Sequence, residues 1–227
     1  MTLIDRPSPN FGPRKSEEGR ADPVDMLVIH YTGMRTGAEA LARLCDPVAQ
    51  VSAHYMIEED GTVYRLVDES LRAWHAGVSS WRGWTDVNSR SVGVELVNPG
   101  HEFGLRPFPA RQIDALTELA QGILARHAIP ARNVVGHSDI APARKQDPGE
   151  LFPWEDLAQR GVGLWCGEGA GIGGAREGVR ELAVYGYDVA DIEAAVAAFQ
   201  RHFRPAGIDG RWDGECAARL SGLLARI

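Results

Sequence analysis

The stretch from Gly136 to Trp154, GHSDIAPARKQDPGELFPW, constrains the chain most, because it gathers reactive side chains in a segment that resists regular structure. Its prolines and its glycine after Pro148 disfavour a regular helix or a central strand, so we expect an irregular loop of fixed shape. His137 and Asp147 can both bind zinc, and Lys145 precedes Asp147 by two residues. A catalytic zinc takes three protein ligands and keeps one position for water. The third ligand must therefore come from another part of the chain.

The candidates for the third ligand are His30, His54 and His75. His30 lies near the end of Met26–Tyr31, an apolar run that predicts a buried strand. Strand ends in α/β folds face the functional crevice, which favours His30. His137 also follows a short predicted strand, Asn133–Gly136, so two strand ends and one loop carboxylate would form a His₂Asp site. No compact HExxH-like motif supports this set, and a lone histidine near an apolar strand is more often a core residue.

Glu95 and Lys145 are candidates for catalytic groups beside such a metal. Glu95 interrupts Ser91–Val97, a valine- and leucine-rich run that predicts a buried strand. Burial disfavours the charged form of a carboxylate and raises its pKa toward neutrality, which suits a general base. The alternative is an ion pair of Glu95 with Arg90 or Arg106. Lys145 can offer positive charge to an oxyanion, although most loop lysines are simply exposed.

Predicted strands and helices intermix along the first two thirds of the chain. This pattern favours an α/β fold, with a mixed central β-sheet flanked by helices. Besides the strands named above, the expected elements are a helix from a capping box at Thr36 and Glu39 to about Leu44, a hairpin of Val51–Ile57 and Thr62–Val67 around Asp60-Gly61, and an amphipathic helix between Pro109 and Pro130.

The chain, at 227 residues, is long enough for one domain and a small second one. A glycine-dense stretch that begins at Gly161 is typical of a linker. Helical patterns at Val179–Tyr187, Ile192–Phe203 and Cys216–Ile227 then predict a small three-helix domain. The expected organisation is an extended arm at residues 1–24, an α/β domain at 25–160, a linker at 161–176 and the three-helix domain at 177–227.

Charge and hydropathy exclude some partners. The net charge of −7 argues against nucleic acid, whose backbone selects basic surfaces. No stretch is long and apolar enough to span a bilayer, so we expect no membrane association of that kind. Residues 1–25 contain no apolar run of the kind that a secretory signal needs. We therefore expect a cytoplasmic protein if Met1 is the true start, and a periplasmic one if translation begins upstream.

Several short motifs occur in one order along residues 8–165. They are His30-Tyr31-Thr32, Val51-Ser52-Ala53-His54-Tyr55, Ala73-Trp74-His75-Ala76-Gly77, Ser91-Val92-Gly93-Val94-Glu95-Leu96, Gly136-His137-Ser138-Asp139-Ile140-Ala141-Pro142 and Lys145-Gln146-Asp147-Pro148-Gly149. In this order they closely resemble the type-2 N-acetylmuramoyl-L-alanine amidases, the family of the AmpD and AmiD enzymes. Ser8-Pro9-Asn10-Phe11 and Leu151-Phe152-Pro153-Trp154 look AmiD-like in particular.

The resemblance implies a zinc amidase with His30, His137 and Asp147 as metal ligands and with Glu95 and Lys145 as catalytic partners. The implied substrate is the amide between the lactyl group of N-acetylmuramic acid, or its 1,6-anhydro form, and L-alanine of the stem peptide. Cell-wall recycling of such muropeptides is the expected role. Residues 177–227 are similar to three-helix peptidoglycan-binding domains, which would add polymeric peptidoglycan as a partner.

Two rival functions keep part of this interpretation. A peptidoglycan-recognition module would bind muropeptides without cutting them, but such modules tend to lack part of the zinc set. A zinc hydrolase acting on an unrelated amide would keep the site and change the substrate, because pocket contacts determine specificity.

Overall fold

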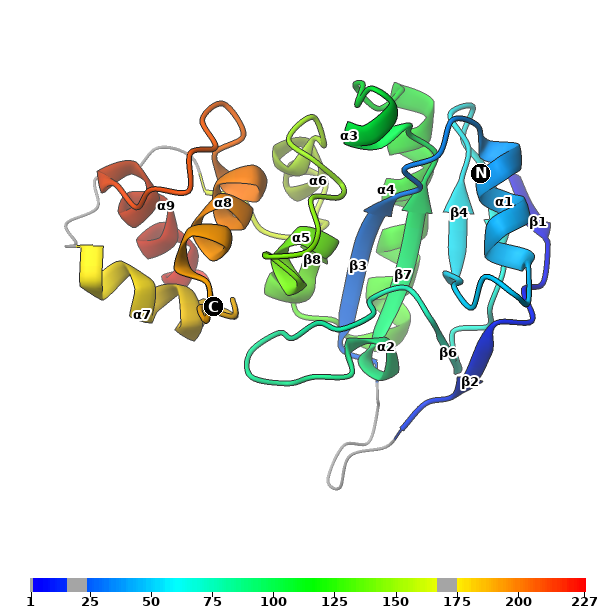
Figure 1. The fold of residues 1–227 in the computed structure, drawn as a ribbon, viewed down its shortest axis with the longest axis horizontal. Coiled ribbons are helices and arrows are strands. Elements are labelled where there is room, and N and C mark those ends of the chain that lie inside the picture. The colour runs from blue at the N-terminus through cyan, green and yellow to red at the C-terminus, as the bar shows by residue number, and fades with distance from the viewer. Residues whose placement is uncertain (1, 16–23, 167–174) are drawn as a thin grey trace.

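The computed structural model describes residues 2–15, 24–166 and 175–227, and a six-stranded sheet lies at its centre (Figure 1). The strand order is β1-β5-β4-β7-β3-β8. Strands β4, β7, β3 and β8 are parallel, whereas β5 is antiparallel to β4 and pairs in parallel with β1. The strands are β1 Thr2–Asp5, β3 Met26–Tyr31, β4 Tyr55–Ile57, β5 Thr62–Arg65, β7 Ser91–Leu96 and β8 Val134–Gly136. The predicted α/β class with a mixed central sheet is confirmed.

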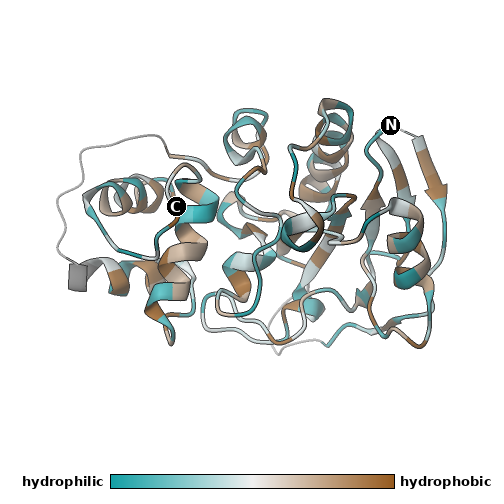
Figure 2. Cartoon of the chain, turned by 45° about the horizontal axis from the view of Figure 1, so that its top comes forward, coloured by the Kyte–Doolittle hydropathy of each residue, from teal (hydrophilic) through white to brown (hydrophobic). Residues whose placement is uncertain are grey.

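Alternation along the central strand β3 places its side chains in two hydrophobic cores, one on each face of the sheet. On β3, Leu27 and Ile29 pack in the core that includes the long helix α4, Ala110–His127. Met26 and Val28 face the opposite side and join a core that extends into the C-terminal helices. The helices carry hydrophobic and hydrophilic residues on different sides, as this packing requires (Figure 2).

The expected local signals explain several element boundaries. Helix α1, Gly37–Cys45, begins at Thr36, whose side chain accepts a hydrogen bond from the Glu39 amide. Strands β4 and β5 form the predicted antiparallel hairpin, although β4 starts only at Tyr55. The remaining short elements outside the C-terminal region are β6 Leu71–Ala73, α2 Val87–Arg90, α3 Gly100–Phe103, a 3₁₀ turn at Ala131–Asn133, α5 His137–Ile140 and α6 Trp154–Gln159.

The segment Gly136–Trp154 is not wholly irregular, which corrects the expectation for its first residues. One helical turn, α5, follows Gly136, and the Asp139 carboxylate closes it by accepting a hydrogen bond from the Gly136 amide at 2.7 Å. After α5, the residues up to Pro153 form turns and bends without a regular helix or strand.

The N-terminal arm forms strands that the sequence did not indicate. β1 extends the edge of the main sheet beside β5, and β2, Phe11–Pro13, pairs antiparallel with β6. These short, proline-flanked segments lack the apolar alternation that predicts a strand, so only tertiary pairing reveals them.

Three helices lie at the C-terminal end of the chain, and α8 is the one that lies beside α5 (Figure 1). They are α7 Ala175–Tyr185, α8 Ile192–Phe203 and α9 Gly214–Leu224. Half of the predicted linker, residues 167–174, lies outside the described residues. Among the helices that the structure describes, none combines the length and the apolar character needed to cross a membrane.

Candidate metal centre

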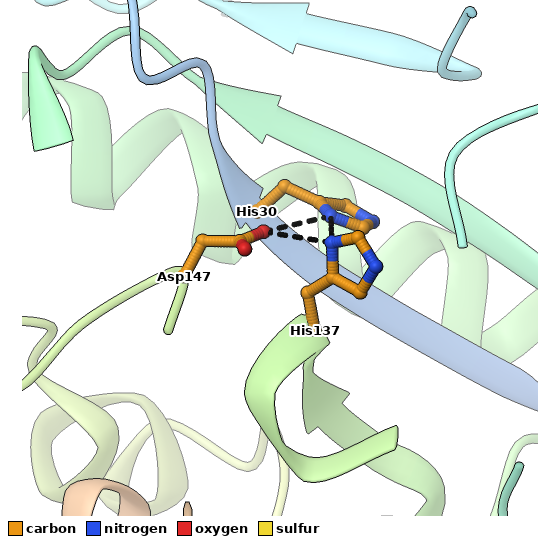
Figure 3. A group of neighbouring side chains, drawn as sticks. All are labelled: His30, His137 and Asp147. Atoms are coloured by element: carbon orange, nitrogen blue, oxygen red, sulfur yellow. Dashed lines mark hydrogen bonds and ion pairs between the residues drawn. The ribbon is translucent and has the colours of Figure 1, made fainter. Parts of the chain in front are cut away.

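His30, His137 and Asp147 form a buried cluster at one edge of the central sheet (Figure 3). The Nδ1 atoms of the two imidazoles lie 3.0 Å apart, and each lies 3.0 Å from Oδ2 of Asp147. In the described part of the chain, this is the one group of histidine, cysteine and carboxylate side chains that could hold a metal ion.

Strand register explains why the two histidines meet. Strands β3 and β8 are adjacent and parallel, and Ile29 pairs with Gly136. The next residues, His30 near the end of β3 and His137 directly after β8, therefore lie side by side at the carboxyl ends of these strands. Asp147 returns to them because its backbone carbonyl accepts a hydrogen bond from the Ser138 amide at 2.9 Å.

A chain of hydrogen bonds behind His30 determines which ring nitrogen carries the proton. Ser91 Oγ donates to the Val87 carbonyl at 2.6 Å, because a carbonyl can only accept. His75 Nε2, 3.1 Å from Ser91 Oγ, must then be the donor of that pair. His75 is neutral, since burial and the neighbouring His30 hold its pKa well below 6.5, so its Nδ1 accepts. His30 Nε2, at 3.0 Å, therefore donates to His75.

His137 is oriented by a backbone group instead. Its Nε2 lies 3.0 Å from the Ala76 carbonyl and must donate to it. Nδ1 of the neutral His30 thus presents a lone pair toward Asp147 and toward Nδ1 of His137, which also carries a lone pair when its ring is neutral. In that state three acceptors converge without a proton between them, which is an arrangement that a bound cation stabilises. The donor set of two imidazoles and one carboxylate fits a metal such as zinc.

Burial and mutual proximity keep His30 and Asp147 in the protonation states that a metal needs. Burial, with His137 nearby, lowers the pKa of His30 to about 4, so the ring is neutral near pH 7. Burial alone would raise the pKa of Asp147, but His137 and His30 hold it below its ordinary value. A neutral imidazole and an ionised carboxylate are the metal-binding forms.

Glu95 lies beside the cluster because it pairs with His30 across β7 and β3. Its Oε2 is inaccessible to solvent and has no hydrogen-bond partner in the described part of the chain. Burial, followed by the charge of Asp147, raises the pKa of Glu95 well above 4.5. The alternative ion pairs are not seen: Arg90 binds Asp25 and Arg106 binds Glu59.

The cluster opens into a cleft of about 750 Å³. Its wall includes the other predicted catalytic residue, half-buried Lys145, together with Glu95 and the aromatic side chain of Trp74. Of the three histidines considered as third ligand, His30 lies in the cluster and His75 lies directly behind it. His54 is held elsewhere, since its Nδ1 accepts from the Gly93 amide at 2.9 Å and its Nε2 donates to the Leu71 carbonyl.

The sequence offered His75 only as a candidate third ligand and assigned no role to Ser91, yet strand β7 carried a signal for the face on which they meet. On β7, Val92, Val94 and Leu96 face α4, whereas Ser91, Gly93 and Glu95 occupy the alternate positions. Gly93 is required there, because a Cβ atom would lie 2.5 Å from the His75 ring. This serine–glycine–glutamate alternation on a buried strand indicates a functional face.

Comparisons with known proteins agree with this geometry. Residues 20–150 match the family model described as N-acetylmuramoyl-L-alanine amidase. The chain is 37% identical to the N-acetylmuramoyl-L-alanine amidase AmiD of Escherichia coli, over 99% of this chain and 91% of AmiD. It is 33% identical to the 1,6-anhydro-N-acetylmuramyl-L-alanine amidase AmpD of Citrobacter freundii, over 65% of this chain and 84% of AmpD.

Solved structures are similar over nearly the full length. E. coli AmiD, in complex with the substrate anhydro-N-acetylmuramic acid-L-Ala-D-gamma-Glu-L-Lys, matches with a TM-score of 0.81 and 36% identity, covering 96% of this chain and 98% of AmiD. AmpDh3 from Pseudomonas aeruginosa, in complex with anhydromuramic pentapeptide, matches with a TM-score of 0.83 and 33% identity, covering 93% and 95%. The chain therefore belongs to the N-acetylmuramoyl-L-alanine amidase family.

Proposed function

We propose that this chain is a zinc amidase that separates the lactyl group of a muropeptide from L-alanine of the stem peptide. The observation that carries the proposal is the convergence of three acceptor atoms beside the unpartnered carboxylate oxygen of Glu95. The substrate class follows from AmiD, which was solved with an anhydromuropeptide, and from the AmpD relatives named for the 1,6-anhydro sugar. Anhydromuropeptides are soluble fragments of the cell wall, so a role in cell-wall recycling fits this substrate class.

His30, His137 and Asp147 would hold the zinc ion. Bound there, zinc would supply Lewis acidity, which activates water and polarises the lactyl carbonyl. Glu95 takes a proton from the attacking water and then gives it to the departing alanine nitrogen, a task suited to a carboxyl group of raised pKa. Lys145 stabilises the negative charge that develops on the carbonyl oxygen. The cleft wall beyond these groups would hold the sugar and the peptide.

The division into residues 25–160 and 177–227, and a contact of the second segment with polymeric peptidoglycan, are parts of the same proposal. The helical C-terminal segment supports the division, and the AmiD match extends beyond the residues of the family model. A cytoplasmic location stays a prediction, which fractionation of cells expressing the native gene would test.

The test uses the purified protein with the anhydromuropeptide that is bound in the AmiD structure and, in parallel, with intact sacculi. Products are followed by mass spectrometry for protein as isolated, after chelation and after zinc is restored. We expect free L-alanyl peptide from the soluble fragment, loss of this product on chelation and its return with zinc. Binding without cleavage in the zinc-loaded state would contradict the proposal and favour a recognition module.

A further inference from the structure

Asp139, two residues after His137, connects the metal centre to the C-terminal helices. Its side chain is buried and accepts three hydrogen bonds, each of 2.7 Å. One comes from the Gly136 amide, at the start of α5. The other two come from the Tyr187 hydroxyl, just after α7, and from His202 Nδ1 on α8. Two of the three donors therefore belong to the C-terminal segment.

The same helices pack closely around this carboxylate. The His202 ring stacks on Trp154 with a centroid distance of 3.8 Å, and on Phe203 with a distance of 3.9 Å. The Tyr187 ring contacts Trp81 edge-on at 5.2 Å, within the core that includes both β3 and the C-terminal helices. His202 and Tyr187 are thus fixed by packing and cannot swing away from Asp139 at low cost.

The turn that presents His137 depends on these contacts. α5 comprises residues His137–Ile140, and a single turn is not stable without tertiary support. Asp139 closes that turn, while the Ser138 amide holds the Asp147 backbone. Gly136 packs closely against the loop that carries Asp147, since a Cβ atom there would lie 2.7 Å from Pro148. A displacement of Asp139 would consequently move two of the three cluster side chains.

We propose that Tyr187 and His202 are positioning residues of the metal centre, which hold Asp139 and, through it, the α5 turn that carries His137. The inference rests on the metal site of the proposed function. It makes the C-terminal helices a structural part of the active centre, whether or not they also bind peptidoglycan.

The experiment compares Tyr187→Phe with Tyr185→Phe in the full-length chain. Tyr185 is a matched control: it lies in the same core and is similarly buried, but its hydroxyl is not a partner of Asp139. Zinc affinity is measured by competition with a chelator, well below the unfolding temperature of each variant, so that lost stability alone does not change the result. We expect roughly tenfold weaker zinc binding for Tyr187→Phe, as for other groups that support metal ligands, and less than about a twofold change for Tyr185→Phe.

A second pair keeps the proposal testable if Tyr187→Phe does not fold. His202→Asn retains a donor near the Nδ1 position, whereas His202→Phe retains the stacking with Trp154 and loses the donor. We expect zinc affinity near that of the wild type for the asparagine variant and weaker binding for the phenylalanine variant. Equal affinities within either pair would overturn the positioning role alone. A wild-type protein that binds no zinc would instead overturn the proposed metal site.

Discussion

His30 and His137 meet at one point but are supported by different kinds of structure. His30 lies on β3, between β7 and β8, and is oriented by the side chains of His75 and Ser91. His137 lies on a single helical turn and is oriented by the Ala76 carbonyl and by contacts of Asp139. One half of the cluster is therefore built into the sheet, and the other half is a loop held by distant segments.

The difference teaches where precision at this centre comes from. A central strand is fixed by hydrogen bonds on both sides, so the sheet half needs only local side chains to set a tautomer. The loop half has few backbone bonds of its own, and its geometry depends on packing between segments far apart in sequence. Each prediction below changes a residue in one half of the cluster and measures the catalytic rate or the zinc affinity.

The largest effect is expected from Glu95→Gln in the sheet half. The change keeps the shape of the side chain and removes the base, so the rate should fall by about 10²–10⁴ with zinc affinity retained. Steady-state hydrolysis of the anhydromuropeptide, with zinc content measured alongside, checks this. A variant of normal activity would exclude Glu95 as the proton carrier.

The pH profile provides a second readout of Glu95. The wild type needs the ionised carboxylate for the first proton transfer, so its rate should fall as the pH decreases through the raised pKa of Glu95. This loss should occur at a pH well above the ordinary 4.5 of a glutamate. Glu95→Gln should lack that acid limb, because the group that titrates is gone.

Lys145→Ala tests the loop half in the same assay. Loss of a group that stabilises an oxyanion typically lowers the rate by about 10²–10³, so we expect a drop of that order with zinc content unchanged. Glu155→Ala, at an exposed position of α6 outside the cleft, is the control and should keep the wild-type rate. Unchanged turnover in the lysine variant would remove Lys145 from the mechanism and leave catalysis to the sheet half.

The two halves also differ in how well the sequence predicted them. In the sheet half, strand Met26–Tyr31 has the predicted boundaries, because its apolar run is a local pattern. Helix Ile192–Phe203, outside the cluster, is also where it was predicted, because it has an apolar stripe and a capping aspartate at Asp191. The meeting of His30 with His137 followed from the expectation that strand ends share an edge. The partners of Asp139 lie 48 and 63 residues away, and no local pattern indicates such pairs.

Removing His75 should weaken zinc binding through the sheet half. Without its Nδ1 acceptor, the His30 ring loses both its orientation and its tautomer, so we expect about 10–100-fold lower zinc affinity for His75→Ala. His75→Asn should recover part of the loss, since its amide oxygen can accept from His30 Nε2. His54→Ala should leave zinc affinity unchanged, because its hydrogen-bond partners, the Gly93 amide, the Leu71 carbonyl and the Arg14 side chain, lie outside the cluster. Equal zinc affinities of His75→Ala and the wild type would refute this role.

The smallest effect is expected from Ser91→Ala, at the far end of the hydrogen bonds that run from His30 through His75. Without the hydroxyl, His75 Nε2 has no fixed acceptor, and the ring can place its proton on Nδ1 instead. That tautomer opposes donation by His30 Nε2 and favours a proton on His30 Nδ1, where the metal should bind. The loss of one hydrogen bond, about 0.5–1.5 kcal/mol, corresponds to roughly a twofold to tenfold decrease in zinc affinity.

Ser89→Ala is the matched control for Ser91→Ala, since Ser89 is also buried and bonds to Asp86 and Arg72 but not to His75. Imidazole nitrogen shifts in ¹⁵N NMR would report the tautomers of His75 and His30 directly. A shifted tautomer with weaker zinc binding in Ser91→Ala alone would establish side-chain control of the sheet half. Unchanged tautomers would mean that strand geometry suffices to orient His30, and the two halves would then differ in their backbone support alone.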